Sequence, residues 1–289
     1  MILSARERNR RGGMLVTGAG SWILATVQFR PQALAPATNL ARVAVYVAEA
    51  QARGARLVVL PELFNTGYLE HAGVHDLAEA ADGTTVRALH ELSRKYSIYL
   101  AGGFAERYHG HVYDSLAFCT PRGEVAIYRK RHLIFWEHYY FRPGREPLIV
   151  ETELGRIGFA ICADMMYQHV WSEYRGKIDL AVISAAWPCS CEGSTRRVAW
   201  LLRPSRHLAG EIPLRVARDL NIAVAFANQC GPCQVRVPML GLSVAQFVGR
   251  SAVYDGHAAK GSEEVAGEGI IFSSVSVREG IAACAILSA

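Results

Sequence analysis

Gly155-Arg-Ile-Gly-Phe-Ala-Ile-Cys-Ala-Asp-Met-Met-Tyr167 is the stretch that decides the fold, because its apolar run ends abruptly at a cysteine. Residues 159–161 are apolar without alternation, which is typical of a strand covered on both faces. A helix is predicted to follow from Ala163. Cys162 would then lie at a strand-to-helix junction, where backbone N–H groups favour a thiolate and can hold an oxyanion. The alternative is an inert core cysteine, since free cysteine is among the most buried residue types.

Apolar periodicity predicts that strands and helices alternate along the chain, as in an α/β protein. The expected strands are 22–29, 57–60, 99–104, 112–119, 125–129, 180–184, 223–227, 246–254, 269–277 and 281–287. The expected helices are 39–53, 84–95, 163–175 and 208–220, and no element is assigned within 187–206. Two strands should form a hairpin around residues 121–123. No linker separates the two βα halves, so residues 22–289 are expected to form one domain.

Charge and composition argue against a nucleic-acid-binding protein. The 289 residues are 51% hydrophobic and 20% charged, as in an ordinary globular enzyme. Of the formal net charge of +5, +3 comes from the four arginines and one glutamate near the N-terminus, so the remainder is nearly neutral. Residues 1–21 are expected to be a disordered basic extension, with Met14 as an alternative start. A twin-arginine signal at Arg10-Arg11 is unsupported, because glycines interrupt the apolar part that follows.

Cysteine usage and hydropathy indicate a cytoplasmic protein that is not integral to a membrane. Seven scattered cysteines fit a reducing compartment better than a disulfide framework. No apolar run reaches the roughly 18 residues needed to cross a bilayer. Four of the cysteines could bind a structural zinc ion, although ordinary free thiols are the favoured interpretation. These four are Cys189, Cys191, Cys230 and Cys233.

Three polar residues at predicted strand ends form a candidate catalytic set. Glu62 follows an apolar strand at the end where α/β proteins bind ligands. Lys130 alternates with Arg129 and Arg131, so a strand would point it toward the interior while the arginines face solvent. A carboxylate can act as the base toward the thiol of Cys162, and a lysine can hold a developing oxyanion.

A papain-like pair is the rival catalytic interpretation. His132, His138 or His169 would then serve as the base for Cys162. Nothing like the papain nucleophile motif surrounds this cysteine, and ten histidines make accidental proximity common. His132 is instead expected to pack near Lys130. The Gly18-Ala-Gly20 segment does not join a strand to a helix, so no dinucleotide site is expected.

Several segments match one enzyme family in the same order along the chain. They are Leu-Pro-Glu-Leu-Phe-Asn-Thr-Gly-Tyr at 60–68, Tyr-Arg-Lys-Arg-His-Leu at 128–133 and Gly-Phe-Ala-Ile-Cys-Ala-Asp at 158–164. Further agreement comes from Val27-Gln-Phe29, Glu137 with Phe141-Arg-Pro-Gly144, Ala186-Trp-Pro188, Asn228 before Gly231, and Phe247-Val-Gly-Arg-Ser251. Through these segments the chain resembles the nitrilase superfamily of carbon-nitrogen hydrolases over residues 22–280.

The resemblance implies a four-layer αββα sandwich and a catalytic triad of glutamate, lysine and cysteine. Glu62 would take the proton of Cys162, which would form a thioester acyl-enzyme. Lys130 and the N–H of Ala163 would stabilise the oxyanion. Water activated by Glu62 would then hydrolyse the thioester, with Glu137 orienting Lys130 and the substrate. The resemblance implies no metal or organic cofactor, and it implies a homodimer or larger homo-oligomer assembled through helices near the nucleophile.

The expected substrate is a small molecule with an amide or carbamoyl C–N bond. The alternative is an acyltransferase or amide synthase, in which an amine captures the thioester in place of water. Nitriles are less favoured, because the Cys-Trp-Glu of true nitrilases is absent. The residues assigned to substrate binding are Tyr68, Trp136, Ala163, Asp164, Met166, Trp187 and Asn228.

Two segments depart from the family pattern. Met165-Met-Tyr-Gln-His169 replaces the usual continuation after the nucleophile and is expected to shape the acyl pocket. The segment after Trp187 carries several arginines, and we hypothesise that one or more of them bind an anionic group of the substrate. These arginines are Arg196, Arg197, Arg203 and Arg206, and solvated surface charge is the alternative.

Overall fold

A computed structural model describes residues 20–68, 73–237, 241–260 and 267–276 of the chain. Its first six-stranded sheet has the strand order β15-β1-β2-β3-β4-β5. These strands are β15 (Gly269–Ser276), β1 (Ser21–Gln28), β2 (Ala55–Val59), β3 (Tyr99–Tyr108), β4 (His111–Cys119) and β5 (Val125–Arg129). The β4 and β5 strands pair antiparallel, which confirms the predicted hairpin.

The second six-stranded sheet has the order β14-β13-β10-β8-β7-β6. Its strands are β14 (Ala259–Lys260), β13 (Ala252–Tyr254), β10 (Ala223–Asn228), β8 (Leu180–Ala185), β7 (Gly155–Ile161) and β6 (Ile149–Thr152). The central three strands, β10, β8 and β7, run parallel. Parallel strands direct their carboxyl ends toward one edge, and there Cys162 follows β7 and Gln229 follows β10.

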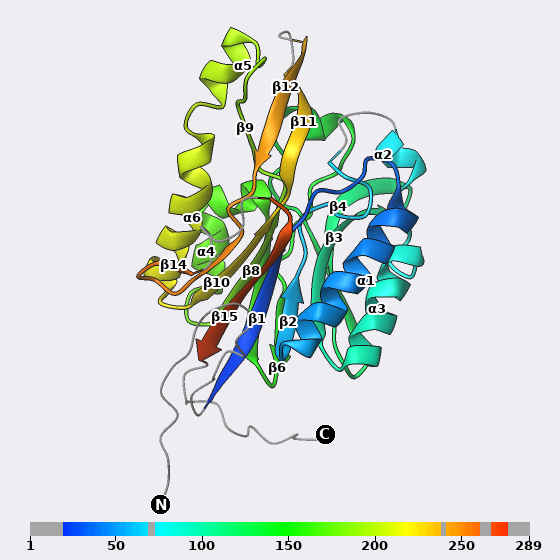
Figure 1. The fold of residues 1–289 in the computed structure, drawn as a ribbon, viewed down its shortest axis with the longest axis vertical. Helices are drawn as coiled ribbons and strands as arrows, with labels where there is room; N and C mark the ends of the chain where they lie inside the picture. The colour runs from blue at the N-terminus through cyan, green and yellow to red at the C-terminus, as the bar shows by residue number, and fades with distance from the viewer. Residues whose placement is uncertain (1–19, 69–72, 238–240, 261–266, 277–289) are drawn as a thin grey trace, which may run out of the picture.

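Helices cover the outer face of each sheet (Figure 1). The α1 (Pro36–Ala52) and α3 (Thr84–Tyr96) helices lie on the first sheet, and α4 (Gln168–Tyr174) and α6 (Ser205–Leu220) lie on the second. A short α2 helix (Gly73–Asp76) precedes α3. The layers therefore follow the order αββα, as the resemblance to the nitrilase superfamily implies.

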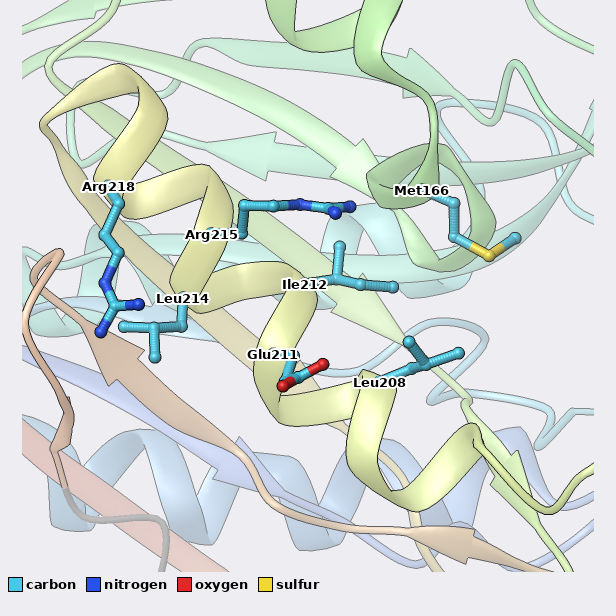
Figure 2. A pocket seen from close by; sticks show the side chains of 7 residues that line it. All are labelled: Met166, Leu208, Glu211, Ile212, Leu214, Arg215 and Arg218. Atoms are coloured by element: carbon cyan, nitrogen blue, oxygen red, sulfur yellow. The ribbon is translucent and has the colours of Figure 1, made fainter.

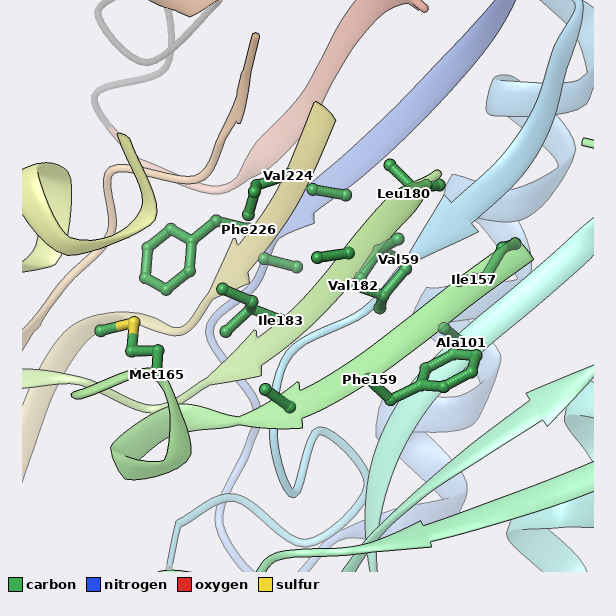
Figure 3. Close-up of a cluster of buried hydrophobic side chains, with 14 of the residues drawn as sticks. Val59, Ala101, Ile157, Phe159, Met165, Leu180, Val182, Ile183, Val224 and Phe226 are labelled. Carbon is green, nitrogen blue, oxygen red and sulfur yellow. The ribbon is translucent and has the colours of Figure 1, made fainter. Parts of the chain in front are cut away.

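The main hydrophobic core lies between the two sheets (Figure 3). Val59 and Ala101 of the first sheet face Phe159 and Val182 of the second. A separate cluster lies between the first sheet and helices α1 and α3. Each inner strand is thus covered on both faces, which explains why its sequence is a continuous apolar run.

A third, three-stranded sheet rises beyond the sandwich and was not predicted. Its order is β11-β12-β9, with β11 at Cys230–Val237, β12 at Gly241–Val248 and β9 at Pro188–Cys189. The α5 helix (Arg196–Leu201) lies beside it (Figure 1). Both β9 and α5 fall in the segment without an assigned element, and β9 is only two residues long, too short to produce a periodic pattern.

Several predicted elements have different bounds in the structure, among them the helices predicted at 39–53 and 208–220, which are α1 and α6. The helix predicted at 163–175 is two elements, the 3₁₀ helix η2 (Cys162–Met166) and α4, because Tyr167 between them has an extended backbone. The strand predicted at 246–254 is broken into β12 and β13, because Gly249 and Arg250 have positive φ angles of 67° and 56°. Ser21 already belongs to β1, so the N-terminal boundary shifts by one residue.

Residues 1–19 of the predicted N-terminal extension lie outside the described residues. The last predicted strand, residues 281–287, also lies outside them. Within the ranges that are described, no helix is both long enough and apolar enough to span a membrane.

We predict that Phe159→Ala lowers the free energy of unfolding by about 3–5 kcal/mol, the usual cost of removing a buried phenylalanine. Phe159 is fully buried, and its ring lies 5.1 Å from the ring of Phe118 on the opposite sheet. Chemical denaturation measures the change. Val125→Ala is the matched control, because Val125 is 41% exposed and its truncation should change stability by less than about 0.5 kcal/mol. Equal losses in the two variants would contradict the description of the core.

Candidate active site

Glu62, Lys130 and Cys162 come together at the carboxyl ends of strands from both sheets. Lys130 directly follows β5, Cys162 directly follows β7, and Glu62 lies three residues beyond β2. Nζ of Lys130 lies 2.6 Å from Oε1 of Glu62. The charges of both residues act on the Cys162 thiol, so the three groups form one electrostatic unit.

Lys130 is fully buried, and its ammonium group is surrounded by carboxylates. Nζ donates hydrogen bonds of 2.6 Å to Glu62 and to Oε1 of Glu137, and Oδ2 of Asp114 lies at 3.3 Å. Burial alone would lower the pKa of this amine, but nearby carboxylates, first Glu137 and then Glu62, raise it well above its ordinary value. Lys130 is therefore a fixed cation, and its side chain points inward as the sequence predicts.

The two arginines beside Lys130 are ion-paired, contrary to the prediction that they are freely solvated. Arg129 donates two hydrogen bonds of 2.6 Å to the buried Glu106, and Arg131 pairs with Glu173 at 2.8 Å. These bidentate pairs fix the strand end on the face opposite Lys130.

Glu62 is held from both its side chain and its backbone. Oε2 accepts a 2.6 Å hydrogen bond from the N–H of Ala186, just after β8, and the backbone oxygen accepts one of 2.8 Å from Gln229. Leu63, the next residue, has a φ of 46°, in the left-handed region that disfavours branched residues. The carboxylate is thus positioned by contacts from the second sheet.

Cys162 is 4% exposed and has a φ of 45°, an uncommon conformation for a residue with a side chain. Burial, and then the charge of Glu62, raise the pKa of its thiol well above the ordinary value, although Lys130 opposes the shift. The prediction that this junction favours a thiolate is therefore wrong: desolvation and neighbouring carboxylates outweigh the backbone dipoles of a five-residue 3₁₀ helix. The resting group is a thiol that needs a base.

Glu137, in the 3₁₀ helix η1 (Phe135–Tyr139), accepts hydrogen bonds from three donors. Besides Lys130, the hydroxyl of Tyr68 donates to Oε1 at 2.7 Å and the N–H of Ile134 donates to Oε2 at 2.9 Å. Trp136 in turn donates its indole N–H to the Tyr68 hydroxyl at 2.9 Å. Burial and the charge of Glu137 raise the pKa of Tyr68 well above its usual value, so the phenol stays protonated and remains a donor.

Asp164, predicted to bind substrate, is hydrogen-bonded within the chain. Its buried carboxylate accepts hydrogen bonds from Tyr128 at 2.8 Å, from the N–H of Ile161 at 3.1 Å and from His132 at 2.8 Å. The Nδ1 atom of His132 also lies 2.8 Å away. Because both oxygens are occupied by the chain itself, Asp164 joins the loop after Lys130 to the loop that carries Cys162.

Two other predicted substrate residues, Asn228 and Trp187, also make contacts within the chain. Asn228 accepts a 2.9 Å hydrogen bond from the N–H of Trp187 and donates one of 2.7 Å to Gly249, so its amide supports backbone. Trp187 is buried, and its indole N–H donates to Ser205 at 3.0 Å. Met166 is 39% exposed and lines a surface pocket with α6 residues, and no triad residue lines this pocket (Figure 2). Ala163 is buried next to Cys162, as its sequence position requires.

The arginines of the α5 region do not contact the triad in any described interaction. Arg196 and Arg197 line a pocket on α5 together with Trp200, which is 76% exposed, and Leu201. Arg206 donates a hydrogen bond to the sulfur of Cys189 at 3.5 Å. The contacts of these residues do not support the hypothesis that they bind an anionic substrate group.

The rival sites weighed from the sequence are not assembled by the described residues. His132 lies against Asp164 and, through Nε2, 2.9 Å from Nε2 of His169, while His138 is exposed. Across the described ranges, only one group of three or more potential metal ligands gathers within 4.8 Å, and it is the carboxylates of Glu62, Asp114 and Glu137. The ammonium group of Lys130 lies against these carboxylates. The four cysteines considered for zinc form no group of this kind among the described residues.

Asp114 is the site residue that sequence reasoning missed. The hairpin register pairs Ser115 with Arg129, and the N–H of Lys130 donates to the backbone oxygen of Asp114 at 2.8 Å. Asp114 therefore lies directly across the hairpin from Lys130. Extending the predicted hairpin by one residue pair would have found it.

Comparison with known proteins gives the same family from sequence and from structure. The sequence model described as carbon-nitrogen hydrolase matches residues 23–259. A nitrilase of Pyrococcus abyssi is 36% identical over 149 residues, covering 50% of this chain and 56% of the relative. The omega-amidase NIT2 of Danio rerio is 32% identical over 165 residues, covering 53% and 59%. The matched part of the chain thus spans little more than half the length of these curated relatives.

A solved structure extends the likeness over most of the chain. It is a CN-hydrolase superfamily protein of Xanthomonas campestris with an arsenic adduct in its active site. It is 25% identical, has a TM-score of 0.69, and the alignment covers 89% of this chain and 91% of that one.

We predict that Gly103→Ala lowers the free energy of unfolding by about 1–3 kcal/mol, as forced overpacking does. A Cβ atom at Gly103 would lie 2.6 Å from Cα of Glu62 and 2.7 Å from the backbone nitrogen of Leu63, and backbone cannot move aside cheaply. Gly267→Ala is the control, because its Cβ would meet no atom within 4 Å. Denaturant unfolding of both variants tests the contact, which would be refuted by equal stabilities.

Proposed function

The chain belongs to the carbon-nitrogen hydrolase family, and from this premise we propose that it cleaves the C–N bond of a small amide or carbamoyl compound through a thioester on Cys162. One observation carries the proposal: the charge of Glu62, whose carboxylate accepts a hydrogen bond from the buried Lys130, acts on the buried thiol of Cys162 and, after burial, raises its pKa. A thiol with a raised pKa needs a base, and we propose that Glu62 acts as this base.

In the first step Glu62 accepts the proton of Cys162 while the sulfur attacks the carbonyl carbon of the substrate. The S–C bond forms, and the carbonyl electron pair moves onto oxygen. Lys130 stabilises this oxyanion with its positive charge and with one N–H group. This N–H group remains for the oxyanion because the other two donate hydrogen bonds to Glu62 and Glu137. The N–H of Ala163 is the second proposed donor.

The tetrahedral intermediate then collapses. The C–N bond breaks, and Glu62 gives its proton to the leaving nitrogen, which departs as ammonia or an amine. In the second step Glu62 takes a proton from water, the hydroxide oxygen attacks the thioester carbon, and the S–C bond breaks. The proton returns to the sulfur of Cys162, so the acid is released and the enzyme regenerated. No additional reactant is required.

A series of hydrogen bonds runs from Lys130 through Glu137 and Tyr68 to Trp136. Tyr68 also meets the ring of Phe247 edge-on at a centroid distance of 6.1 Å. We propose that Glu137 orients Lys130 and that the aromatic rings contact the acyl part of the substrate. Nitriles remain less favoured, because Ala163 and Asp164 follow the nucleophile where true nitrilases carry Trp-Glu.

Assembly and location extend the proposal. We propose a homodimer or larger homo-oligomer built through η2, α4 and α6, where Met166 and Tyr167 are 39% and 37% exposed beside a pocket lined largely by α6 (Figure 2). Sedimentation velocity tests it. The cytoplasm remains the proposed compartment, because five cysteines of the described ranges are free thiols, namely Cys119, Cys162, Cys189, Cys191 and Cys230.

We predict that Cys162→Ala abolishes ammonia release from a panel of small amides and that Glu62→Gln lowers turnover by roughly 10²–10⁴-fold, the range expected for a lost general base. Cys191→Ser is the matched control, because this half-buried cysteine lies outside the cluster, and it should keep wild-type turnover.

Running the same panel with added amines separates hydrolysis from acyl transfer. Free acid as the product supports the hydrolase, whereas an amide of the added amine supports the acyltransferase alternative. Full activity of the Cys162→Ala variant would reject both.

A further inference from the structure

Asp114 is a fully buried carboxyl group that the proposed chemistry does not use. It lies on β4, opposite Lys130 across the hairpin, with one oxygen within 4.8 Å of oxygens of Glu62 and Glu137. Three carboxyl groups therefore surround one ammonium group. If all three were ionised, the cluster would carry an excess of two negative charges in a water-poor interior, which is strongly unfavourable.

Hydrogen-bond donors show which of the three carries a proton. Glu137 accepts from Lys130, Tyr68 and the N–H of Ile134, and Glu62 accepts from Lys130 and the N–H of Ala186. These donors stabilise Glu137 and Glu62 in the ionised, carboxylate form. Neither oxygen of Asp114 accepts a hydrogen bond from any described residue. A buried carboxylate without donors is costly, whereas a carboxylic acid can donate to an ionised neighbour.

We infer that Asp114 is a positioning residue, held as a neutral carboxylic acid that donates its hydroxyl to Glu62 and leaves the third N–H of Lys130 free for the substrate oxygen. Burial, and then the charge of Glu62, raise the pKa of Asp114 well above 3.8, and a hydrogen bond with Glu62 adds to the shift while Lys130 opposes it. The groups that face Asp114 are Glu62 after β2, Lys130 after β5 and Glu137 on η1.

The neutral state matters for the reaction. An ionised Asp114, with Oδ2 at 3.3 Å from Nζ, would compete for the N–H that the oxyanion needs. It would also place a further negative charge near Glu62 and the Cys162 sulfur and oppose the development of negative charge during attack. Asp114 keeps its proton throughout the cycle: the proton of Cys162 moves to Glu62 and then to the leaving nitrogen.

This inference rests on the proposed amide hydrolysis, and kinetics provide its first test. Asp114→Ala should lower kcat by about tenfold to a hundredfold, the usual effect of losing a hydrogen bond to a charged group, with a smaller change in KM. Asp114→Asn should recover most of that loss, because its NH₂ can donate to Glu62. A kcat for the asparagine variant no higher than that of the alanine variant would overturn the positioning role.

The pH profile gives a readout that a packing role would not change. In the wild type kcat/KM should fall on the alkaline side as Asp114 loses its proton, and in Asp114→Asn this fall should move to higher pH. Glu106→Gln is the matched control, because Glu106 is equally buried on the neighbouring strand but faces Arg129. In this variant kcat/KM should fall at the same alkaline pH as in the wild type. An alkaline limb shared by the wild type and Asp114→Asn would also overturn the inference.

Thermal unfolding tests the neutral carboxyl without any substrate. Below the ordinary pKa of 3.8, Asp114 is protonated in both folded and unfolded chains, so the wild type and Asp114→Asn should unfold alike. As the pH rises above this value, Asp114 ionises in the unfolded wild type but keeps its proton in the folded one. The wild type therefore loses stability relative to the variant until the pH reaches the raised pKa of Asp114 in the folded chain.

At pH 7 the asparagine variant should therefore melt higher, by about 2–4 °C or more. A wild-type Tm equal to that of the variant at every pH would show that Asp114 is not held neutral. If the wild type hydrolyses no amide, the proposed function fails while this measurement still decides the protonation of Asp114. If the alanine variant does not fold, the wild-type and asparagine comparisons decide the inference.

Discussion

The ammonium group of Lys130 lies in the interior, bonded at 2.6 Å to both Glu62 and Glu137. Removing a charged amine from water costs several kcal/mol, so this arrangement persists only while carboxylates from other elements remain against it. The backbone around it is packed accordingly. The N–H of Gly144 donates to Lys130 at 2.7 Å, and a Cβ there would lie 2.3 Å from the backbone oxygen of Arg129. The buried charge on Nζ of Lys130 thus constrains the backbone of the loops that surround it.

The sequence predicts most of the sandwich because its inner strands are buried on both faces. Continuous apolar runs such as 57–60 and 180–184 mark these strands, and the polar residue that ends each run marks an edge where ligands bind. The inward direction of Lys130 also follows from simple alternation with its two arginine neighbours. The triad could therefore be assembled from local patterns, supported by the family resemblance.

Properties that depend on contacts between distant segments could not be predicted in the same way. The pKa of Cys162 is set by desolvation and by Glu62, which is 100 residues away, so local backbone dipoles gave the wrong sign. The third sheet depends on a two-residue strand, β9, whose pairing with β12 has no local signature. The sequence also showed no sign that residues far from Asp164 in the chain donate hydrogen bonds to both of its carboxylate oxygens, because only the tertiary structure brings them together.

The contacts of Asp164 have a consequence for how the protein fluctuates. One buried carboxylate accepts hydrogen bonds from β5, from the loop after Lys130 and from the last residue of β7. Neither loop can separate from the other without leaving this charge unpaired, which is unfavourable in the interior. The two loops should therefore open in a single cooperative event, as one foldon, and their amide hydrogens should exchange with solvent at a common rate.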